Sequence, residues 1–306
     1  MTDQLSKYLF EDKSVRAEAV SLRDTWLQVQ KAHAYPPAVS RLLGELVAAS
    51  TLLSANLKYD GTLILQLQGD GDVLLIVVEC RSDLSLRATV KLREGAHIPE
   101  DASFQSLLNP GGSGRFSIIL DPTHRRPGQA PYQGVVPLKG NSVAEALEHY
   151  MATSEQLQTR LWLQADADRA VGLLLQRLPR DGGKVQLEDA DETWNRAVHL
   201  ASTLTADEML TVDTQTLIHR LYWDETLIAF EPLQVRFHCP CSRDRVANML
   251  RMLGREEVKD IVAEQGQVEV TCDYCSSVYV FDAVDCAELF ATSTPPSAGH
   301  QSSSTH

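Results

Sequence analysis

Four cysteines towards the C-terminal end of the chain have the spacing of a metal site. They form a C-x-C pair, Cys239 and Cys241, and a C-x2-C pair, Cys272 and Cys275, with 30 residues between the pairs. Four thiolates at about 2.3 Å from one Zn²⁺ fill its tetrahedral coordination and leave no open position. The surrounding segment of about 55 residues has few large apolar groups, so metal binding would supply part of its folding free energy. The spacing therefore predicts one Zn²⁺ held by these four cysteines.

The same cysteines could also be oxidised. Structural zinc sites usually use C-x2-C to C-x4-C pairs, whereas a single residue between Cys239 and Cys241 places two sulfurs close enough to oxidise to each other. Oxidation of both pairs would destroy all four ligands, and a fold that depends on the metal would be lost. A static zinc clip is the alternative, and the C-x-C pair favours the redox switch over it.

Other reactive residues are predicted to have ordinary roles. Cys80 ends an apolar strand and Cys286 lies in an apparent helix, so packing in the core is expected for both. His238 precedes Cys239 directly, but four cysteines already fill a zinc coordination sphere. The glycine-rich stretches 69–71 and 111–114 lack the Lys-Ser/Thr of a phosphate-binding loop and are predicted to be turns.

Length and charge limit the functional classes. A chain of 306 residues predicts two units and a connecting segment. Its formal charge of −13 would repel phosphate backbones, which argues against nucleic acid as a partner. No secretory signal is visible, and the longest apolar run, Val73–Val78, is far below the roughly 20 residues of a membrane span. We therefore expect a cytoplasmic protein without a membrane partner, in which clustered cysteines serve metal or redox chemistry.

The first part of the chain, residues 1–182, is predicted to be an α+β domain with a mainly antiparallel sheet. Apolar residues at helical spacing indicate a helix over 39–53. Ser142 has capping-box spacing and should open another helix. Short turns between neighbouring strands favour antiparallel pairing. The predicted strands are 63–67, 73–78, 84–92, 115–120, 132–138, 160–164 and 171–178.

The rest of the chain is predicted to contain a helical linker, a zinc domain and a tail. The linker, residues 183–234, follows the turn residues Asp181-Gly182-Gly183, and its pattern is helical from about 191 to 225. Its helices are short, so they should need a docking surface, with Leu217, Ile218 and Leu221 on the docking stripe. Residues 235–290 form the predicted zinc-binding redox-switch domain. The tail, 291–306, has no charged Asp, Glu, Lys or Arg and is predicted to be disordered.

The chain resembles the 33 kDa chaperonin family of redox-regulated heat-shock chaperones from Tyr8 to Phe290. The paired cysteine spacing is the most specific feature of this resemblance. Trp223, where many members have His, the extra thiol of Cys286 and the tail depart from the family pattern. The matching segments are Tyr8-Leu9-Phe10, Val15-Arg16, Leu57 to Gly61, Leu65 to Gly71, Tyr132 to Val136, Ser154 to Leu157, Arg220-Leu221-Tyr222, Phe237 to Arg243 and Cys272 to Cys275.

The resemblance implies a holdase chaperone rather than an enzyme. It implies that Cys239, Cys241, Cys272 and Cys275 hold one zinc ion in a reduced, inactive form. Peroxide or hypochlorous acid would then form the disulfides Cys239–Cys241 and Cys272–Cys275 and release zinc. The zinc domain and linker would unfold and expose a surface that binds unfolded client proteins without ATP. The family's active form is a homodimer.

Two rival functions fit the sequence less well. A zinc-ribbon nucleic-acid binder should be basic, but residues 231–289 hold six basic and eleven acidic residues. A thiol–disulfide oxidoreductase should have its C-x2-C after a strand, opening a helix. Cys272 follows an apparent strand, but 278–281 after the pair indicates another strand rather than a helix.

Overall fold

A computed structural model describes residues 3–56, 58, 60–125, 130–179 and 187–291. The chain divides into two compact units, unit 1 (Met1–His238) and unit 2 (Cys239–His306), and each is described by itself. The predicted boundary at Asp181-Gly182-Gly183 and the predicted disordered tail from residue 292 onward lie outside the described residues. The domain boundaries derived from the sequence therefore stay predictions.

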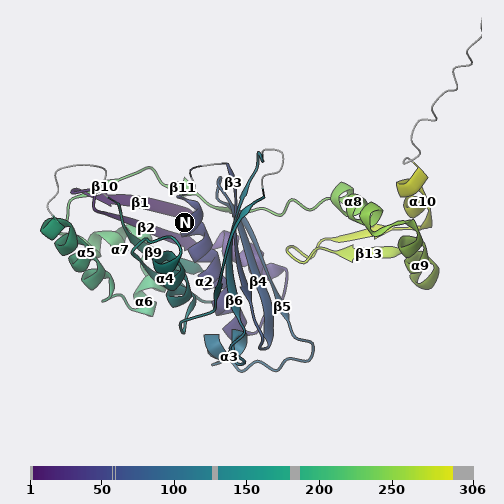
Figure 1. Ribbon diagram of the computed structural model, residues 1–306, viewed down its shortest axis with the longest axis horizontal. Coiled ribbons are helices and arrows are strands. Elements are labelled where there is room, and N and C mark those ends of the chain that lie inside the picture. Colours follow the sequence, from purple (N-terminus) through teal and green to yellow (C-terminus); the bar gives the residue numbers. More distant parts are fainter. Residues whose placement is uncertain (1–2, 57, 59, 126–129, 180–186, 292–306) are drawn as a thin grey trace, which may run out of the picture. The chain divides into compact units, whose positions relative to one another are not determined.

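Unit 1 contains two six-stranded sheets, where the sequence indicated one (Figure 1). In the first sheet the strand order is β10-β1-β2-β9-β8, and β11 also pairs with β1. All pairings in this sheet are antiparallel. Its strands are β1 (Gln4–Phe10), β2 (Val15–Leu22), β8 (Thr159–Ala165), β9 (Ala170–Arg177), β10 (Leu227–Ala229) and β11 (Leu233–Gln234).

The second sheet has the order β12-β5-β4-β3-β6-β7. Its pairings are antiparallel except for β12, which runs parallel to β5 and pairs Phe237 with Leu86. The predicted strands between residues 63 and 138 are confirmed, and so is the mainly antiparallel arrangement. The strands are β3 (Gly61–Gln68), β4 (Val73–Arg81), β5 (Ser85–Leu92), β6 (Arg115–Pro122), β7 (Tyr132–Pro137) and β12 (Arg236–Phe237).

Helix α2 (Pro37–Ser54) joins the two sheets into one core. It packs on strands of both sheets, and most of its residues are buried because apolar side chains occur on nearly all its faces. Gly44 permits the close approach, since a Cβ there would lie 2.4 Å from Cβ of Ala165. The other helices before the linker are α1 (Asp24–Lys31), α3 (Phe104–Leu108) and α4 (Val143–Thr153), and α4 has the predicted Ser142 cap.

The linker helices α5 (Leu187–Ala201), α6 (Ala206–Thr211) and α7 (Thr214–Leu221) cover the face of the first sheet opposite α2. Side chains alternate across a strand, so β2 turns Val20 and Leu22 towards α2 and turns Ala17 and Ala19 towards the linker. β9 has a continuous apolar sequence and is buried along almost its whole length. Helix α2, the first sheet and the linker helices therefore form successive layers in unit 1.

Unit 2 is a small α+β unit around a two-stranded antiparallel sheet. Its elements are α8 (Arg243–Leu253), α9 (Arg255–Gln265), β13 (Val268–Thr271), β14 (Val278–Phe281) and α10 (Ala283–Ala291). Gly266 ends α9 with φ of 81°, a left-handed conformation that glycine adopts without strain. The buried core consists of Val246, Ala247, Leu250, Val258, Val268, Phe281, Cys286 and Leu289.

The mixed α+β class predicted from the sequence is confirmed, including helices after residue 187 and a C-terminal unit that contains four clustered cysteines. Among the described helices, none combines the length and the apolar character needed to cross a membrane.

Candidate functional site

Four sulfur atoms of unit 2 come together although their residues lie far apart in the sequence. The Sγ atoms of Cys239, Cys241, Cys272 and Cys275 all lie within 4.8 Å of one another. Sγ of Cys239 is 3.7 Å from Sγ of Cys272, and Sγ of Cys241 is 3.3 Å from Sγ of Cys275. All four residues are partly exposed, so small reagents can reach them.

These distances fit one zinc ion. Four sulfurs at 2.3 Å from a tetrahedral centre lie about 3.8 Å from one another, close to the two separations above. Thiolates are the donor set that structural zinc sites use most, and four of them complete the coordination. The cluster can therefore bind one zinc ion, and within the described residues it is the group of side chains that meets the geometric requirement for a metal site.

Each cysteine pair is presented by a defined turn. Cys239 and Cys241 lie directly before α8, whose first turn is capped by Ser242. Cys272 and Cys275 lie in the turn between β13 and β14, where the backbone N–H of Ser276 donates to the carbonyl of Cys272 over 2.8 Å. The turn is tight because Ser276 adopts a left-handed conformation with φ of 55°. A strand follows this C-x2-C pair, so the helix-opening arrangement of a thiol–disulfide oxidoreductase is not formed.

Two hydroxyl groups touch the sulfurs, and the sequence analysis did not single them out. The Tyr279 hydroxyl donates a hydrogen bond to Sγ of Cys241 over 3.1 Å. Ser277 Oγ lies 3.3 Å from Sγ of Cys275. The alternation of β14 could have indicated Tyr279, since it shares the inner face with Phe281 while Val278 and Val280 are exposed.

The surroundings shift the pKa values of two sulfurs in opposite directions. Burial raises the pKa of Cys272 above its ordinary value, although backbone N–H groups of Tyr274 and Cys275 act against it. For Cys275 burial also acts upward, but hydrogen bonds with Ser277, Cys241 and Cys272 together outweigh it and lower the pKa to about 7. A lowered pKa favours the thiolate, which is the metal ligand and the nucleophile.

Arginines tie the helices of unit 2 to its hairpin and to α10. The Arg243 guanidinium donates to the carbonyl of Val280 over 2.6 Å and pairs with Asp285 at 2.8 Å. It also lies 4.1 Å from the centre of the Phe281 ring. Arg251 donates to the carbonyl of Leu289 over 3.2 Å. Both arginines lie on α8, so they link this helix to β14 and α10 around a core of eight buried residues.

The other cysteines are buried and lie outside the cluster, as predicted. Burial raises the pKa of the Cys80 thiol to about 12. Burial also raises the pKa of Cys286, which is part of the unit 2 core. His238 belongs to unit 1, where its backbone N–H donates to the carbonyl of Leu86 over 2.9 Å. It is not part of the cluster of potential metal ligands.

The linker residues singled out from the sequence lie against the first sheet. Ile218 is buried with Ala17 and Leu173, and Leu217 is buried with Val171 and Met209. Leu221 is partly buried against both groups. On the face of the first sheet that the linker helices cover, β2 and β9 form an apolar stripe. It consists of Val15, Ala17, Ala19, Leu173 and Leu175.

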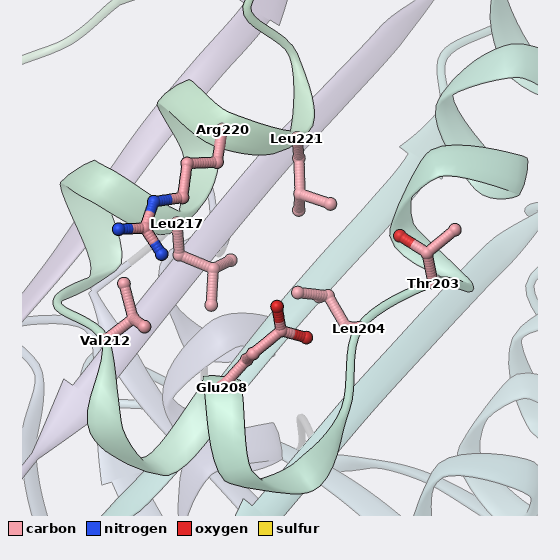
Figure 2. A pocket seen from close by; sticks show the side chains of 7 residues that line it. All are labelled: Thr203, Leu204, Glu208, Val212, Leu217, Arg220 and Leu221. Atoms are coloured by element: carbon pink, nitrogen blue, oxygen red, sulfur yellow. The ribbon is translucent and has the colours of Figure 1, made fainter.

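A cavity of about 180 Å³ opens among the linker helices (Figure 2). The side chains of Leu204, Leu217 and Leu221 point into it, and the charged groups of Glu208 and Arg220 flank it. Such a cavity leaves the leucines with fewer packing contacts than a filled core would provide. The linker is therefore packed against the sheet but less tightly than α2.

Comparisons with known proteins agree with this architecture. A family model described as Hsp33 protein matches residues 3–282. The 33 kDa chaperonin of Methylobacillus flagellatus is 45% identical over 294 residues, which cover 95% of this chain and 96% of the relative. The 33 kDa chaperonin of Ectopseudomonas mendocina is 44% identical over 292 residues, with coverage of 95% and 96%. The crystal structure of the Thermotoga maritima 33 kDa chaperonin (heat shock protein 33 homolog) has a TM-score of 0.79 at 21% identity, covering 94% of this chain and 98% of that one.

The family assignment follows from these matches. The likeness to the Thermotoga maritima structure shows the fold. The family model extends across both units and includes all four clustered cysteines. Relatives at 44–45% identity match along nearly their whole length. The resemblance seen in the sequence is confirmed, and this chain belongs to the Hsp33 family of chaperones.

Proposed function

We propose that this protein is a redox-regulated, ATP-independent holdase chaperone of the cytoplasm. In the reduced form Cys239, Cys241, Cys272 and Cys275 would hold one zinc ion, and the protein would be inactive. Oxidation would release the ion and expose a surface for unfolded client proteins. The observation that carries the proposal is the group of four sulfurs within 4.8 Å of one another beside a very small core.

A bound zinc ion would supply only cross-linking of the two halves of unit 2, because four cysteines leave no coordination position for a substrate. The cysteines before α8 would be held to the cysteines of the β13–β14 turn. The chain's own residues would do the rest: Ser242 caps α8, and Arg243 joins that helix to β14 and α10. This division of roles makes the fold of unit 2 depend on the oxidation state of four sulfurs.

In the proposed oxidation step, a peroxide is the oxidant. One thiolate attacks a peroxide oxygen, the O–O bond breaks, hydroxide leaves, and the sulfur becomes a sulfenic acid. A second thiolate displaces the sulfenic hydroxide and forms the disulfide. Each disulfide therefore consumes one peroxide and two thiolates. We propose the pairs Cys239–Cys241 and Cys272–Cys275, which leave no thiolate for the metal. Their sulfurs lie within 4.8 Å of each other, as do all pairs in the cluster.

The linker supplies the second half of the proposed switch. It precedes Cys239 in the sequence and covers the apolar stripe of β2 and β9 that includes Ala17 and Leu173. If the linker helices undocked, their own apolar faces and this stripe would form a contiguous exposed patch, the ordinary basis of non-specific protein binding. We propose that unfolded clients bind there and that the activated form is a homodimer. The chaperone family supports client binding as the activity.

The test compares reduced, zinc-loaded protein with protein oxidised by peroxide at mildly raised temperature. The oxidised sample should suppress aggregation of chemically unfolded citrate synthase without ATP, and the reduced sample should not. Released zinc is measured with a chromogenic chelator, and molecular mass by light scattering. Dithiothreitol should reverse the disulfides.

Equal suppression by both samples would overturn the redox control and leave a static zinc clip. Suppression by neither sample would overturn the holdase activity. A quadruple Cys→Ser variant of the cluster is the matched control, because it has neither zinc nor disulfides and should suppress aggregation regardless of peroxide.

A further inference from the structure

The hydroxyl of Tyr279 contacts a sulfur of the cysteine cluster in unit 2. The hydroxyl donates to Sγ of Cys241 over 3.1 Å, across 38 positions of sequence. The ring is held in place because Tyr279 pairs with Val270 across the hairpin and packs on the unit 2 core. Its strand neighbours Val278 and Val280 are exposed, so the alternation of β14 points Tyr279 inward.

We propose that Tyr279 is a positioning residue of the redox centre: its hydroxyl binds the Cys241 sulfur and slows oxidation of that sulfur by peroxide. The proposal rests on the function proposed above and adds a residue that slows the oxidation step. The hydrogen bond slows oxidation because it uses a lone pair of the thiolate, and it must be weakened when the sulfur begins to share that pair with oxygen.

The affected step is the first bond change in oxidation. The lone pair of Cys241 Sγ forms an S–O bond to one oxygen of hydrogen peroxide, the O–O bond breaks, and hydroxide leaves. The sulfur is oxidised by two electrons and the peroxide is reduced by two. A donor fixed at 3.1 Å stabilises the negative sulfur before this step more than the neutral sulfenic acid after it.

The second hydroxyl near the cluster offers a contrast. Ser277 Oγ lies 3.3 Å from Sγ of Cys275, but Ser277 is exposed, so water can replace its hydroxyl. Tyr279 is half-buried, and its ring stays against the core when the hydroxyl alone is removed. The structure therefore predicts a large effect for Tyr279→Phe and a small one for Ser277→Ala.

The experiment uses full-length, reduced, zinc-loaded protein in four forms: wild type, Tyr279→Phe, Ser277→Ala and Thr271→Val. Thr271→Val removes an exposed side-chain hydroxyl from the neighbouring strand and is the matched control. Zinc release in excess peroxide is followed with a chromogenic chelator. Tyr279→Phe should release zinc about three- to tenfold faster than wild type, as expected from loss of part of a charge-assisted hydrogen bond. The other two variants should stay within about twofold.

A second readout does not involve oxidation. The protein is loaded with Co²⁺, and the sulfur-to-cobalt charge-transfer absorption is recorded. Loss of the hydrogen bond should move this band to longer wavelength in Tyr279→Phe but not in Thr271→Val. Replacement of Tyr279 by 3-fluorotyrosine, whose hydroxyl is a stronger donor, should shift the band the other way and slow zinc release.

The outcomes separate the two proposals. An unchanged rate of zinc release together with an unchanged cobalt band in Tyr279→Phe would show that Tyr279 only packs. Slower zinc release in this variant would show that the hydroxyl promotes oxidation instead of slowing it. Either result overturns the inference while leaving the redox switch intact. If wild type loses no zinc to peroxide, the switch itself fails, and the cobalt band still decides whether Tyr279 binds the sulfur.

Discussion

Tyr222 donates a hydrogen bond from its hydroxyl to the carbonyl oxygen of Ala197 over 3.2 Å. This bond joins the end of α7 to α5, and the Tyr222 ring packs edge-on against Phe10 of β1 with 5.3 Å between ring centres. Arg196 and Glu225 form an ion pair between the same two parts of the linker. These polar and ring contacts hold the linker to itself and to the sheet in addition to the apolar packing of its helices.

Weakening the packing of α7 on the first sheet should activate the reduced protein. Ile218→Ala and Leu217→Ala remove buried side chains from a connecting segment, a type of change that costs about 2–5 kcal/mol. Leu221→Ala should have a smaller effect because Leu221 is only partly buried. We expect the first two variants to suppress citrate synthase aggregation while still reduced and zinc-loaded. Limited proteolysis should cut residues 187–231 before the rest of unit 1.

The matched control is His219→Ala, an exposed position on the same helix, which should remain inactive until oxidised. If Ile218→Ala and Leu217→Ala stay inactive when reduced and respond normally to peroxide, the linker does not mask the client surface.

Removal of zinc should unfold unit 2 and, through the proposed switch, undock the linker, while the two sheets of unit 1 stay folded. The unit 2 core has eight buried residues, whereas unit 1 has a large core around α2. Trp26 is buried in the core around α2 and Trp162 lies on β8, whereas Trp194 and Trp223 lie in the linker. In a Trp194→Phe/Trp223→Phe variant, a strong chelator with reductant should therefore reduce the helical circular dichroism signal and leave the urea midpoint of tryptophan fluorescence nearly unchanged. A loss of both signals together would mean that the units do not unfold independently.

Much of the fold could be predicted because its patterns are long and local. The helical spacing around Leu43 and the alternation around Leu65 both correspond to real elements, as does the cap Ser142. The division of the strands into two sheets could not be derived in this way. It depends on α2 packing between them, which is a long-range contact.

The short strands at the sheet edges show the same limit. β12 has only two residues, and Phe237 adopts its strand conformation because it pairs with Leu86 in a distant part of the chain. In the site, the cysteine spacing predicted the cluster, because two closely spaced cysteine pairs are a usual ligand set of structural zinc sites. Tyr279 lies among ordinary strand residues, and only the fold brings its hydroxyl to Cys241.

Zinc stoichiometry should separate the cluster from the other cysteines. Single Ser substitutions of Cys239, Cys241, Cys272 or Cys275 should lower bound zinc well below one per chain after dialysis against a weak chelator, because each removes one of four ligands. Cys80→Ser and Cys286→Ala should keep one zinc per chain, since both residues are buried outside the cluster. Zinc is measured by atomic absorption. Loss of zinc in Cys80→Ser in a protein that still folds would contradict the ligand set.

The stability of unit 1 should fall as pH rises from about 4.5 to about 7 because of Glu45. Burial within α2 raises the pKa of this carboxyl to about 7, with the Arg41 charge acting in the opposite direction. In the unfolded chain the pKa is near its ordinary value of 4.5. The folded state therefore binds the proton more tightly, and its advantage is complete below pH 4.5 and is lost as pH rises through 7.

Glu45→Gln should remove this dependence because the amide does not ionise. Between pH 5 and pH 8 the free energy of unfolding of wild type should fall relative to Glu45→Gln by about 1–3 kcal/mol, because the pKa is about 7 in the fold and 4.5 in the unfolded chain. Urea unfolding followed by tryptophan fluorescence measures this quantity for unit 1. Glu94→Gln is the control, because Glu94 is exposed and its replacement should leave the pH dependence as in wild type. Parallel curves for wild type and Glu45→Gln would show that Glu45 is ionised in the fold at neutral pH and that α2 accommodates its charge.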